Sequence, residues 1–250
     1  MGEQSRIVIV GATSLIAEHC ARLWSENACV DMTLVGRDML KIERVALDLR
    51  VRSPKSNIRV VLADFSDPVT IQAVVNSICS LGPIDRVLIA QGSLPEQFDC
   101  EANLEVCNAA LQINGVSPVL FAEAFAQHFT RWGGGTLGLI GSVAGDRGRR
   151  SNYAYGAAKG MLARYAEGLQ HRFFNTAIKI ILIKPGPTHT PMTAHLKRTN
   201  AKLAAVEDVA KRIVCAMERG DLVCYAPSKW KYIMLVIRSL PMAIFGKLDV

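Results

Sequence analysis

Several features are scarce or missing in this 250-residue sequence, and each absence excludes a class of protein. Its seven cysteines contain no Cys-x-x-Cys pair, so neither a metal site nor a disulfide framework is expected. The first residues lead almost at once into an apolar strand-like run, which leaves no room for a secretory signal peptide. Near the C-terminus the longest fully apolar piece, residues 232–237, is far shorter than the roughly twenty residues that span a bilayer. We therefore expect a cytoplasmic protein, either free or at the inner face of the membrane.

The charge balance is basic. Lys and Arg number 29 against 22 Asp and Glu, and the resulting formal net charge of +7 favours an anionic partner. The sequence has no zinc-finger spacing, no RNA-binding aromatic signature and no unbroken basic tract, so nucleic acid is not expected as a partner. A phosphorylated small molecule, a phospholipid surface or an acidic carrier protein fits the charge equally well.

Short apolar runs that alternate with helical patterns predict the fold. The runs are apolar on both faces, which is typical of parallel strands covered by helices on both sides. We therefore expect an α/β fold, with a single Rossmann-type doubly wound domain over residues 1–250 and a parallel sheet of about seven strands. The expected strands are residues 7–10, 32–35, 58–62, 87–90, 136–140, 178–183 and 222–225. The expected helices are residues 15–25, 39–50, 68–79, 115–132, 155–174 and 207–219.

Two segments lie outside this pattern. Residues 185–204 form the longest irregular stretch and hold three prolines, and a loop of this length after a strand is usually functional, so it is predicted to be the substrate loop. Residues 228–250 are predicted to form an amphipathic C-terminal segment, with aromatic and apolar side chains between basic ones. Such a segment can lie in a membrane interface, or it can pack against the core or a second subunit.

The turn after the first strand, residues 11–17, consists mostly of small residues and leads into a helix. Free backbone N–H groups and the helix dipole make such a turn a site for a pyrophosphate, although a tight turn without a nucleotide would look the same. The second strand ends at Arg37. An acid at this place pairs with the ribose of NAD, whereas an arginine can pair with a 2′-phosphate, so the sequence favours NADP(H) over NAD(H).

Four polar residues in the middle of the chain predict carbonyl chemistry. Tyr155 and Lys159 are four residues apart at the start of a long helical pattern, so they share one face. A nearby ammonium lowers the pKa of a phenol, which makes the tyrosine a usable proton donor and acceptor. Ser142, at the end of the fifth expected strand, could hold a carbonyl oxygen beside it, and Asn114, at the start of an earlier helix, could anchor a water.

At these residues the chain resembles the short-chain dehydrogenase/reductase family over nearly its full length. The resemblance implies that Asn114, Ser142, Tyr155 and Lys159 form a catalytic tetrad beside a nicotinamide dinucleotide. It places these residues at the cofactor: Gly11, Thr13, Ser14, Leu15, Ile16, Arg37, Asp64, Phe65, Gln91, Gly92, Tyr155, Lys159, Pro185, Gly186, Thr188 and Thr190. Asp64 would lie near the adenine and Thr190 would contact the carboxamide.

Two segments depart from the family pattern. Leu15 and Ala17 stand where the family's turn has its second and third glycines, and residues 90–93 read Ala-Gln-Gly-Ser where the family has Asn-Asn-Ala-Gly. The larger side chain of Leu15 narrows the approach to the phosphates. The catalytic residues are unaffected.

The second half is similar to a narrower group, the actinobacterial reductases of decaprenylphosphoryl-2-keto-erythropentose and their bacterial relatives, over residues 144–155, 190–197 and 230–241. This resemblance implies a 2-keto sugar carried on a polyprenyl phosphate, and hence a role in cell-envelope polysaccharide metabolism. Basic residues on two expected loops are candidates for binding the phosphate: Arg147, Arg149, Arg150, His195 and Lys197. An exposed basic loop or a subunit contact would account for the same residues.

The sequence therefore predicts an NADPH-dependent carbonyl reductase that forms a homodimer or homotetramer. Tyr155 would protonate the carbonyl oxygen, Ser142 would hold that oxygen, Lys159 would lower the tyrosine pKa and bind the ribose, and Asn114 would position a relay water. A 3-ketoacyl or small-ketone reductase is the alternative among enzymes. A catalytically idle nucleotide-binding scaffold is the alternative from another class.

Overall fold

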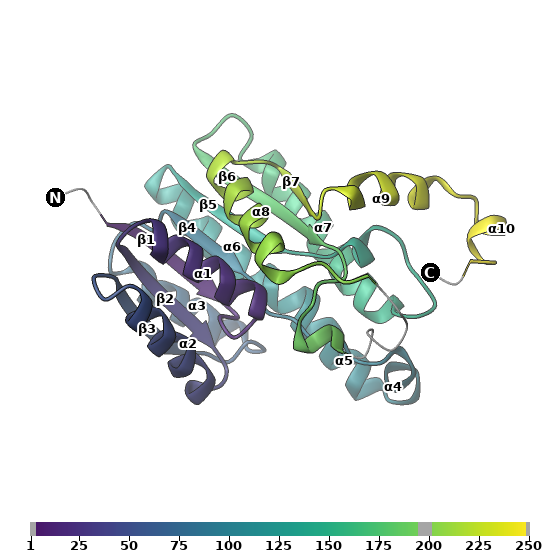
Figure 1. Ribbon diagram of the computed structural model, residues 1–250, viewed down its shortest axis with the longest axis horizontal. Coiled ribbons are helices and arrows are strands. Elements are labelled where there is room, and N and C mark those ends of the chain that lie inside the picture. Colours follow the sequence, from purple (N-terminus) through teal and green to yellow (C-terminus); the bar gives the residue numbers. More distant parts are fainter. Residues whose placement is uncertain (1–3, 195–201, 249–250) are drawn as a thin grey trace.

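The computed structural model describes residues 4–194 and 202–248, and its centre is one parallel sheet of seven strands (Figure 1). The strand order is β3-β2-β1-β4-β5-β6-β7, which confirms the predicted doubly wound α/β fold. The strands are β1 (Ser5–Val10), β2 (Val30–Gly36), β3 (Asn57–Leu62), β4 (Arg86–Ile89), β5 (Gly135–Ile140), β6 (Ile178–Pro185) and β7 (Val223–Ala226). The order reverses between β1 and β4, and in such sheets the crevice at this reversal is where ligands bind.

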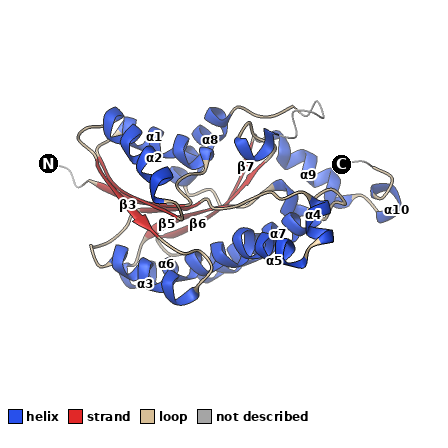
Figure 2. Ribbon diagram, turned by 90° about the horizontal axis from the view of Figure 1, so that it is seen from below, coloured by secondary structure: helices blue, strands red, loops and turns tan. Residues whose placement is uncertain are grey.

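β1 shows why the strands are apolar on both faces. Ile7 and Ile9 point into one hydrophobic cluster, whereas Val8 and Val10, which alternate with them, point into another. All four side chains are buried because helices cover both sides of the sheet (Figure 2). An exposed face would have required polar residues at every second position.

The helices form two layers, one on each side of the sheet (Figure 2). One layer holds α1 (Leu15–Asn27), α2 (Met39–Arg52) and α8 (Val206–Arg219). The other holds α3 (Pro68–Cys79), α6 (Ser117–Trp132) and α7 (Tyr153–Arg172). The shorter helices are α4 (Gln97–Ala102), α5 (Leu104–Leu111), α9 (Lys229–Ser239) and α10 (Met242–Phe245), together with the π-helical turn η1 (Gln112–Val116) and the 3-10 turn η2 (Val143–Asp146).

The helix predicted over residues 115–132 begins eleven residues earlier than expected. α5, η1 and α6 follow one another without a break, and Asn103 caps the start by accepting hydrogen bonds from the backbone N–H groups of Glu105 and Val106. Within the described residues, Leu104–Trp132 is a helical stretch long and apolar enough to cross a membrane by length and composition, but more than half of its apolar 18-residue window is buried in the fold. α6 turns Phe121, Phe125 and Phe129 into the core, as expected of a helix that covers a sheet.

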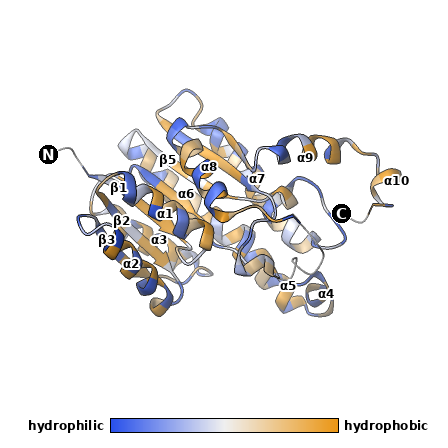
Figure 3. Cartoon of the chain, viewed as in Figure 1, coloured by the Kyte–Doolittle hydropathy of each residue, from blue (hydrophilic) through white to orange (hydrophobic). Residues whose placement is uncertain are grey.

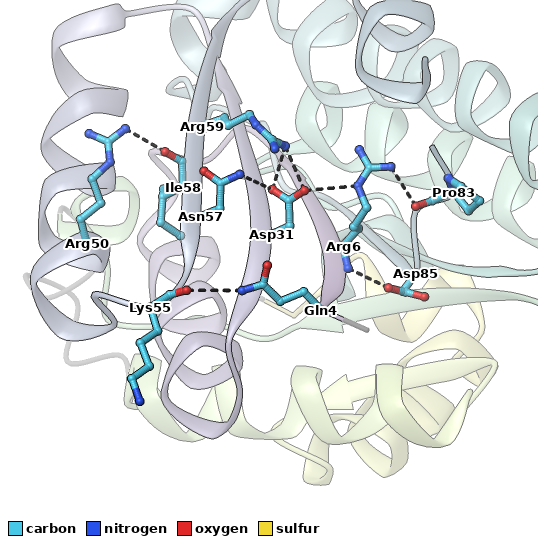
Figure 4. Close-up of polar contacts among 10 residues, drawn as sticks. All are labelled: Gln4, Arg6, Asp31, Arg50, Lys55, Asn57, Ile58, Arg59, Pro83 and Asp85. Carbon is cyan, nitrogen blue, oxygen red and sulfur yellow. Dashed lines mark hydrogen bonds and ion pairs between the residues drawn. The ribbon is translucent and has the colours of Figure 1, made fainter. Parts of the chain in front are cut away.

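The amino ends of β1 to β3 carry a polar network that ties the strands together (Figure 4). Asp31 accepts hydrogen bonds from Arg59 at 2.7 Å and Asn57 at 3.1 Å, and Arg6 donates to the carbonyl of Pro83 at 3.0 Å. The charges of this edge are thus paired with one another. The residues with predicted functions lie at the opposite, carboxyl ends of the strands.

The predicted substrate loop, residues 185–204, starts at the end of β6. Its two ends are joined, because Ala204 donates its N–H to Pro187 at 2.9 Å and accepts one from His189 at 2.8 Å. Residues 195–201, which include His195 and Lys197, lie outside the described residues.

Candidate active site

A cavity of about 520 Å³ opens along the carboxyl ends of the central strands. Most of the residues that the sequence assigned to the cofactor line it: Gly11, Thr13, Ser14, Ile16, Arg37, Phe65, Gln91, Gly92, Tyr155, Lys159, Pro185, Gly186, Thr188 and Thr190. Ser142 and Arg149 line the same cavity. Leu15 and Asp64 do not, and the Asp64 carboxylate instead accepts hydrogen bonds from the N–H and hydroxyl of Ser66.

The turn between β1 and α1 is shaped to meet an anion. Gly11 has φ +78°, and a Cβ there would lie 2.4 Å from the backbone nitrogen of Gln91, so only glycine fits between the two strands. The next residues lead directly into α1, and the side chain of Ser14 does not cap the helix. The first N–H groups of α1 therefore remain available at the cavity, where the helix dipole favours a phosphate.

Two cations lie at the end of the cavity next to β2. Arg37 stacks over the ring of Phe65 at 5.8 Å, and Lys41 lies one turn further along in α2. Asp38 caps α2 through the N–H of Lys41 and pairs with the Lys41 ammonium at 3.1 Å. Sequence reasoning missed Lys41, although its position four residues after Arg37 at the start of a helix was a signal that it would face the same way.

Ser142, Tyr155 and Lys159 meet at the carboxyl end of β5. Ser142 follows the strand and forms a hydrogen bond with the hydroxyl of Tyr155, which comes from the first turn of α7. Lys159, one turn further along, is 3% exposed and donates from Nζ to the carbonyl of Ile140 at 2.9 Å. The local sequence accounts for this arrangement, because a strand end and a helix start place the three side chains at one edge of the sheet.

The effect predicted for Lys159 on the tyrosine is wrong for the structure as described. Burial raises the pKa of Tyr155, and only the hydrogen bond with Ser142 opposes the rise. Burial also lowers the pKa of Lys159, to about 7, so its ammonium and neutral amine forms are comparably populated at neutral pH. The Nζ atom lies 5.9 Å from the centre of the Tyr155 ring and is directed to Ile140.

Asn114 lies in the π-helical turn rather than at the start of a helix. Its amide donates to the carbonyl of Ala110 at 2.9 Å, and its oxygen accepts the backbone N–H of Ser93 at 2.9 Å. The extra residue of a π-turn re-aims side chains, and such turns are frequent at functional sites. Asn114 thereby holds the segment after β4 beside the cavity, while its own side chain is fully buried and does not line it.

The predicted phosphate-binding arginines separate in the structure. Arg147 points away from the cavity: its guanidinium donates to the carbonyls of Ile237 at 2.5 Å and Leu240 at 2.6 Å, and it stacks on Phe245. The assignment of Arg147 to the phosphate is therefore wrong, because its guanidinium is hydrogen-bonded to carbonyls at the C-terminal end of α9. Arg150 is exposed and does not line the cavity.

Arg149 does line the cavity. Its Nη2 lies 3.5 Å from the sulfur of Met234, while its Nε is buried and has no hydrogen-bond partner among the residues that the structure describes. Burial lowers the pKa of the guanidinium and Asp146 opposes this. Gln91 and Asn152 also line the cavity, and Gln91 Oε1 and Asn152 Oδ1 are likewise buried without a partner in the described part of the chain. Buried polar atoms are normally satisfied, so these three fit a site that takes a polar ligand. Sequence reasoning missed Asn152.

The family comparison agrees with this geometry. The family described as short chain dehydrogenase (adh_short) matches residues 5–201 of the chain. The chain belongs to the short-chain dehydrogenase/reductase family. As a member it is an NAD(P)-dependent oxidoreductase, which confirms the family predicted from the sequence.

Relatives of this short-chain dehydrogenase/reductase cover nearly its full length or all of it. An uncharacterized oxidoreductase of Streptomyces coelicolor is 27% identical over 250 residues, which is 100% of this chain and 98% of the relative. An uncharacterized oxidoreductase of Mycobacterium tuberculosis is 28% identical over 246 residues, or 97% and 96% of the two chains.

Solved structures share the fold. A short-chain dehydrogenase from Burkholderia cenocepacia J2315 in complex with NADP superposes with a TM-score of 0.82 at 17% identity. The matched region covers 99% of this chain and 98% of the Burkholderia chain. A short-chain dehydrogenase from Sphingobium yanoikuyae in complex with NADPH gives 0.78 at 21% identity, with 98% and 96% covered. At these identities the likeness shows the fold alone.

Proposed function

We propose that this chain is an NADPH-dependent reductase of a phosphorylated ketone. The observation that carries the proposal is one cavity with two ends. Ser142, Tyr155 and Lys159 lie at one end, and Arg37 lies at the other beside β2. The two solved relatives that hold NADP or NADPH support the choice of the phosphorylated cofactor.

The residues present fit a bound dinucleotide. The uncapped start of α1 would hold the pyrophosphate, and Arg37 with Lys41 would pair with the 2′-phosphate. Pro185 to Thr190 would lie against the nicotinamide, and Lys159 would hold its ribose. When bound, the cofactor supplies the hydride that reduces the carbonyl carbon.

Ser142 and the side chains around it bind the carbonyl oxygen and supply the proton that it takes up. The Ser142 hydroxyl holds the carbonyl oxygen, and the Tyr155 hydroxyl beside it donates a proton to that oxygen as it becomes an alkoxide. Because burial raises its pKa, Tyr155 is protonated at neutral pH, and the protonated phenol is the form that reduction needs. Asn114 fixes the neighbouring segment by accepting the N–H of Ser93.

The substrate end of the cavity offers a cation and an acceptor. The Arg149 guanidinium can pair with a phosphate, and the Asn152 oxygen can accept from a sugar hydroxyl. A 2-keto sugar carried on a polyprenyl phosphate satisfies both groups, as the resemblance of residues 144–155 and 230–241 also suggests. A 3-ketoacyl thioester has no hydroxyl for the Asn152 oxygen to accept from, so Asn152 favours the sugar.

Substrate preference tests the assignment. A keto sugar with a phosphoryl-lipid should be reduced far better than the same sugar without phosphate. Arg149→Met should raise the KM for the phosphorylated substrate about ten- to a hundredfold with little change in kcat, because a remote anchor binds ground and transition states alike. Arg131→Met, a matched change at an exposed arginine on α6, should leave both constants unchanged. Equal rates with and without phosphate would overturn the substrate assignment.

The proton donor is tested separately. Tyr155→Phe should lower kcat at least about a hundredfold and leave NADPH binding nearly intact, because only the hydroxyl is lost. Turnover near that of the parent would remove Tyr155 from the mechanism. NADPH binding by the parent without turnover of any ketone would favour the idle nucleotide-binding scaffold.

A further inference from the structure

The C-terminal arm, residues 229–248, extends away from the sheet and its helix layers (Figures 1 and 2). Only one side of α9 faces the rest of the chain. Trp230 packs on Gly186, where an added Cβ would lie 1.9 Å from its indole nitrogen, and Met234 contacts Arg149. The Arg147 guanidinium binds the carbonyls that end α9 and stacks on Phe245 of α10 at 3.9 Å. The arm is therefore held in place at its base and at its middle.

The opposite side of α9 is apolar and faces solvent. Tyr232, Leu235 and Val236 occupy positions i, i+3 and i+4 and are 69%, 65% and 61% exposed. Such spacing places them on one stripe of the helix. Met242 and Ile244 of α10 continue the exposed apolar surface, and Figure 3 shows hydrophobic residues along both helices. We call these five side chains the apolar stripe.

Basic residues flank the apolar stripe. On a helical projection Lys231 and Arg238 lie along one side of it and Lys229 along the other, and all three are exposed. Lys247 follows α10. In the sequence from residue 222 to residue 250 the acidic side chain is Asp249, against four lysines and arginines, so the C-terminal segment is net positive.

We propose that the C-terminal arm docks on the surface of an anionic membrane. An exposed apolar stripe with aromatic residues and flanking lysines is what inserts at the boundary between headgroups and acyl chains, while the cations bind lipid phosphates. A second copy of the chain would present the same positive arm, and the charges would repel rather than complement one another. Docking in this way holds the cavity mouth near the lipid, because Met234 on the inner side of α9 touches Arg149.

This inference deepens the proposed function, since a lipid-carried substrate is met at a membrane, but it can be tested without any substrate. The full-length protein should co-sediment with vesicles of phosphatidylcholine and phosphatidylglycerol and bind vesicles of pure phosphatidylcholine much less. Added salt should weaken the binding, because it screens the charge attraction.

Two variants test the apolar stripe. Val236→Glu should weaken binding to the anionic vesicles about tenfold, because it places a negative charge in the stripe. Val51→Glu is the matched control: Val51 is 79% exposed on α2 between Arg50 and Arg52, and this change should leave binding unaltered. Both variants should keep the parent's melting temperature and its rate on a soluble ketone, so a fall in binding is not caused by unfolding.

A third variant tests the charge. Lys231→Gln should reduce binding to anionic vesicles about fivefold and leave the weak binding to phosphatidylcholine unchanged. Absence of vesicle binding by the parent, or equal binding of the Val236→Glu and parent proteins, would overturn the proposal. So would sedimentation velocity without lipid showing that Val236→Glu breaks an oligomer, because the stripe would then be a subunit interface. Vesicle binding combined with no preference for phosphorylated ketones would retain the arm assignment and reject the substrate assignment.

Discussion

Replacing Lys159 with methionine should make the protein more stable while it abolishes activity. Lys159 is buried against Ile140 with no acidic partner among the described residues, and desolvation lowers its pKa from 10.5 to about 7. A depressed pKa means that the folded state disfavours the protonated amine. Methionine has a similar length and no charge, so it removes this cost.

The size of the effect follows from the pKa difference. Below pH 7 Lys159 is protonated in both the folded and the unfolded chain, and there the pKa difference lowers the free energy of unfolding by about 5 kcal/mol. Near pH 7 half of the folded chains have released the proton, and the loss is about 4 kcal/mol. Losing the hydrogen bond to the Ile140 carbonyl opposes the gain by about 1 to 2 kcal/mol. The net gain for Lys159→Met near pH 7 should therefore be about 2 to 3 kcal/mol, or about 5 to 10 °C in melting temperature for a chain of this size.

The pH dependence gives a sharper test than the size. Above the folded pKa near 7 and below the unfolded pKa of 10.5, the unfolded chain keeps a proton on Lys159 that the folded chain has released. The parent should therefore gain stability as the pH rises through this range, and its free energy of unfolding should approach that of the variant near pH 10. Urea denaturation at several pH values measures both curves.

Lys41→Met is the control for this comparison. Lys41 is exposed and paired with Asp38, so its replacement should change stability by no more than about 0.5 kcal/mol at any of these pH values. The reasoning is refuted if Lys159→Met is less stable than the parent near pH 7. It is also refuted if the free energies of unfolding of Lys159→Met and the parent differ by the same amount at pH 7 and at pH 10.

Three further changes have defined outcomes. Arg37→Asp should shift the ratio of NADPH to NADH dissociation constants by a few kcal/mol towards NADH, because it removes the 2′-phosphate partner, and an unchanged ratio in fluorescence titration would show that Arg37 faces solvent. Arg147→Met should release the end of α9, seen as faster hydrogen exchange confined to the arm, whereas exchange equal to the parent's would mean that its carbonyl contacts do not hold the helix. Gly186→Ala should lower the melting temperature by roughly 3 to 9 °C, since its methyl would overlap the Trp230 indole, and an unshifted melting curve would show that the indole moves aside freely.

The sequence patterns of single strands and helices were enough to predict the layers of the fold and the grouping of Ser142, Tyr155 and Lys159. Alternating apolar residues such as Ile7 to Val10 fix which side of a strand each side chain takes, so the layers follow from the sequence. Tyr155 and Lys159 share a helix face through their spacing of four, and Ser142 directly follows a strand that must end at the same edge of the sheet. Each of these relations depends on neighbours along one element, which is why sequence alone determined them.

Relations between distant elements were decided by the tertiary structure. Arg147, Arg149 and Arg150 are neighbours in an irregular segment with no periodicity to orient them, and only the packing of α9, more than eighty residues further along, turned Arg147 to its carbonyls and left Arg149 in the cavity. The pKa of Lys159 likewise depends on how completely other segments exclude water from it, and no spacing encodes that. The local sequence determined which side chains lie near the carboxyl edge of the sheet. Burial and packing between distant elements determined which of them face the cavity.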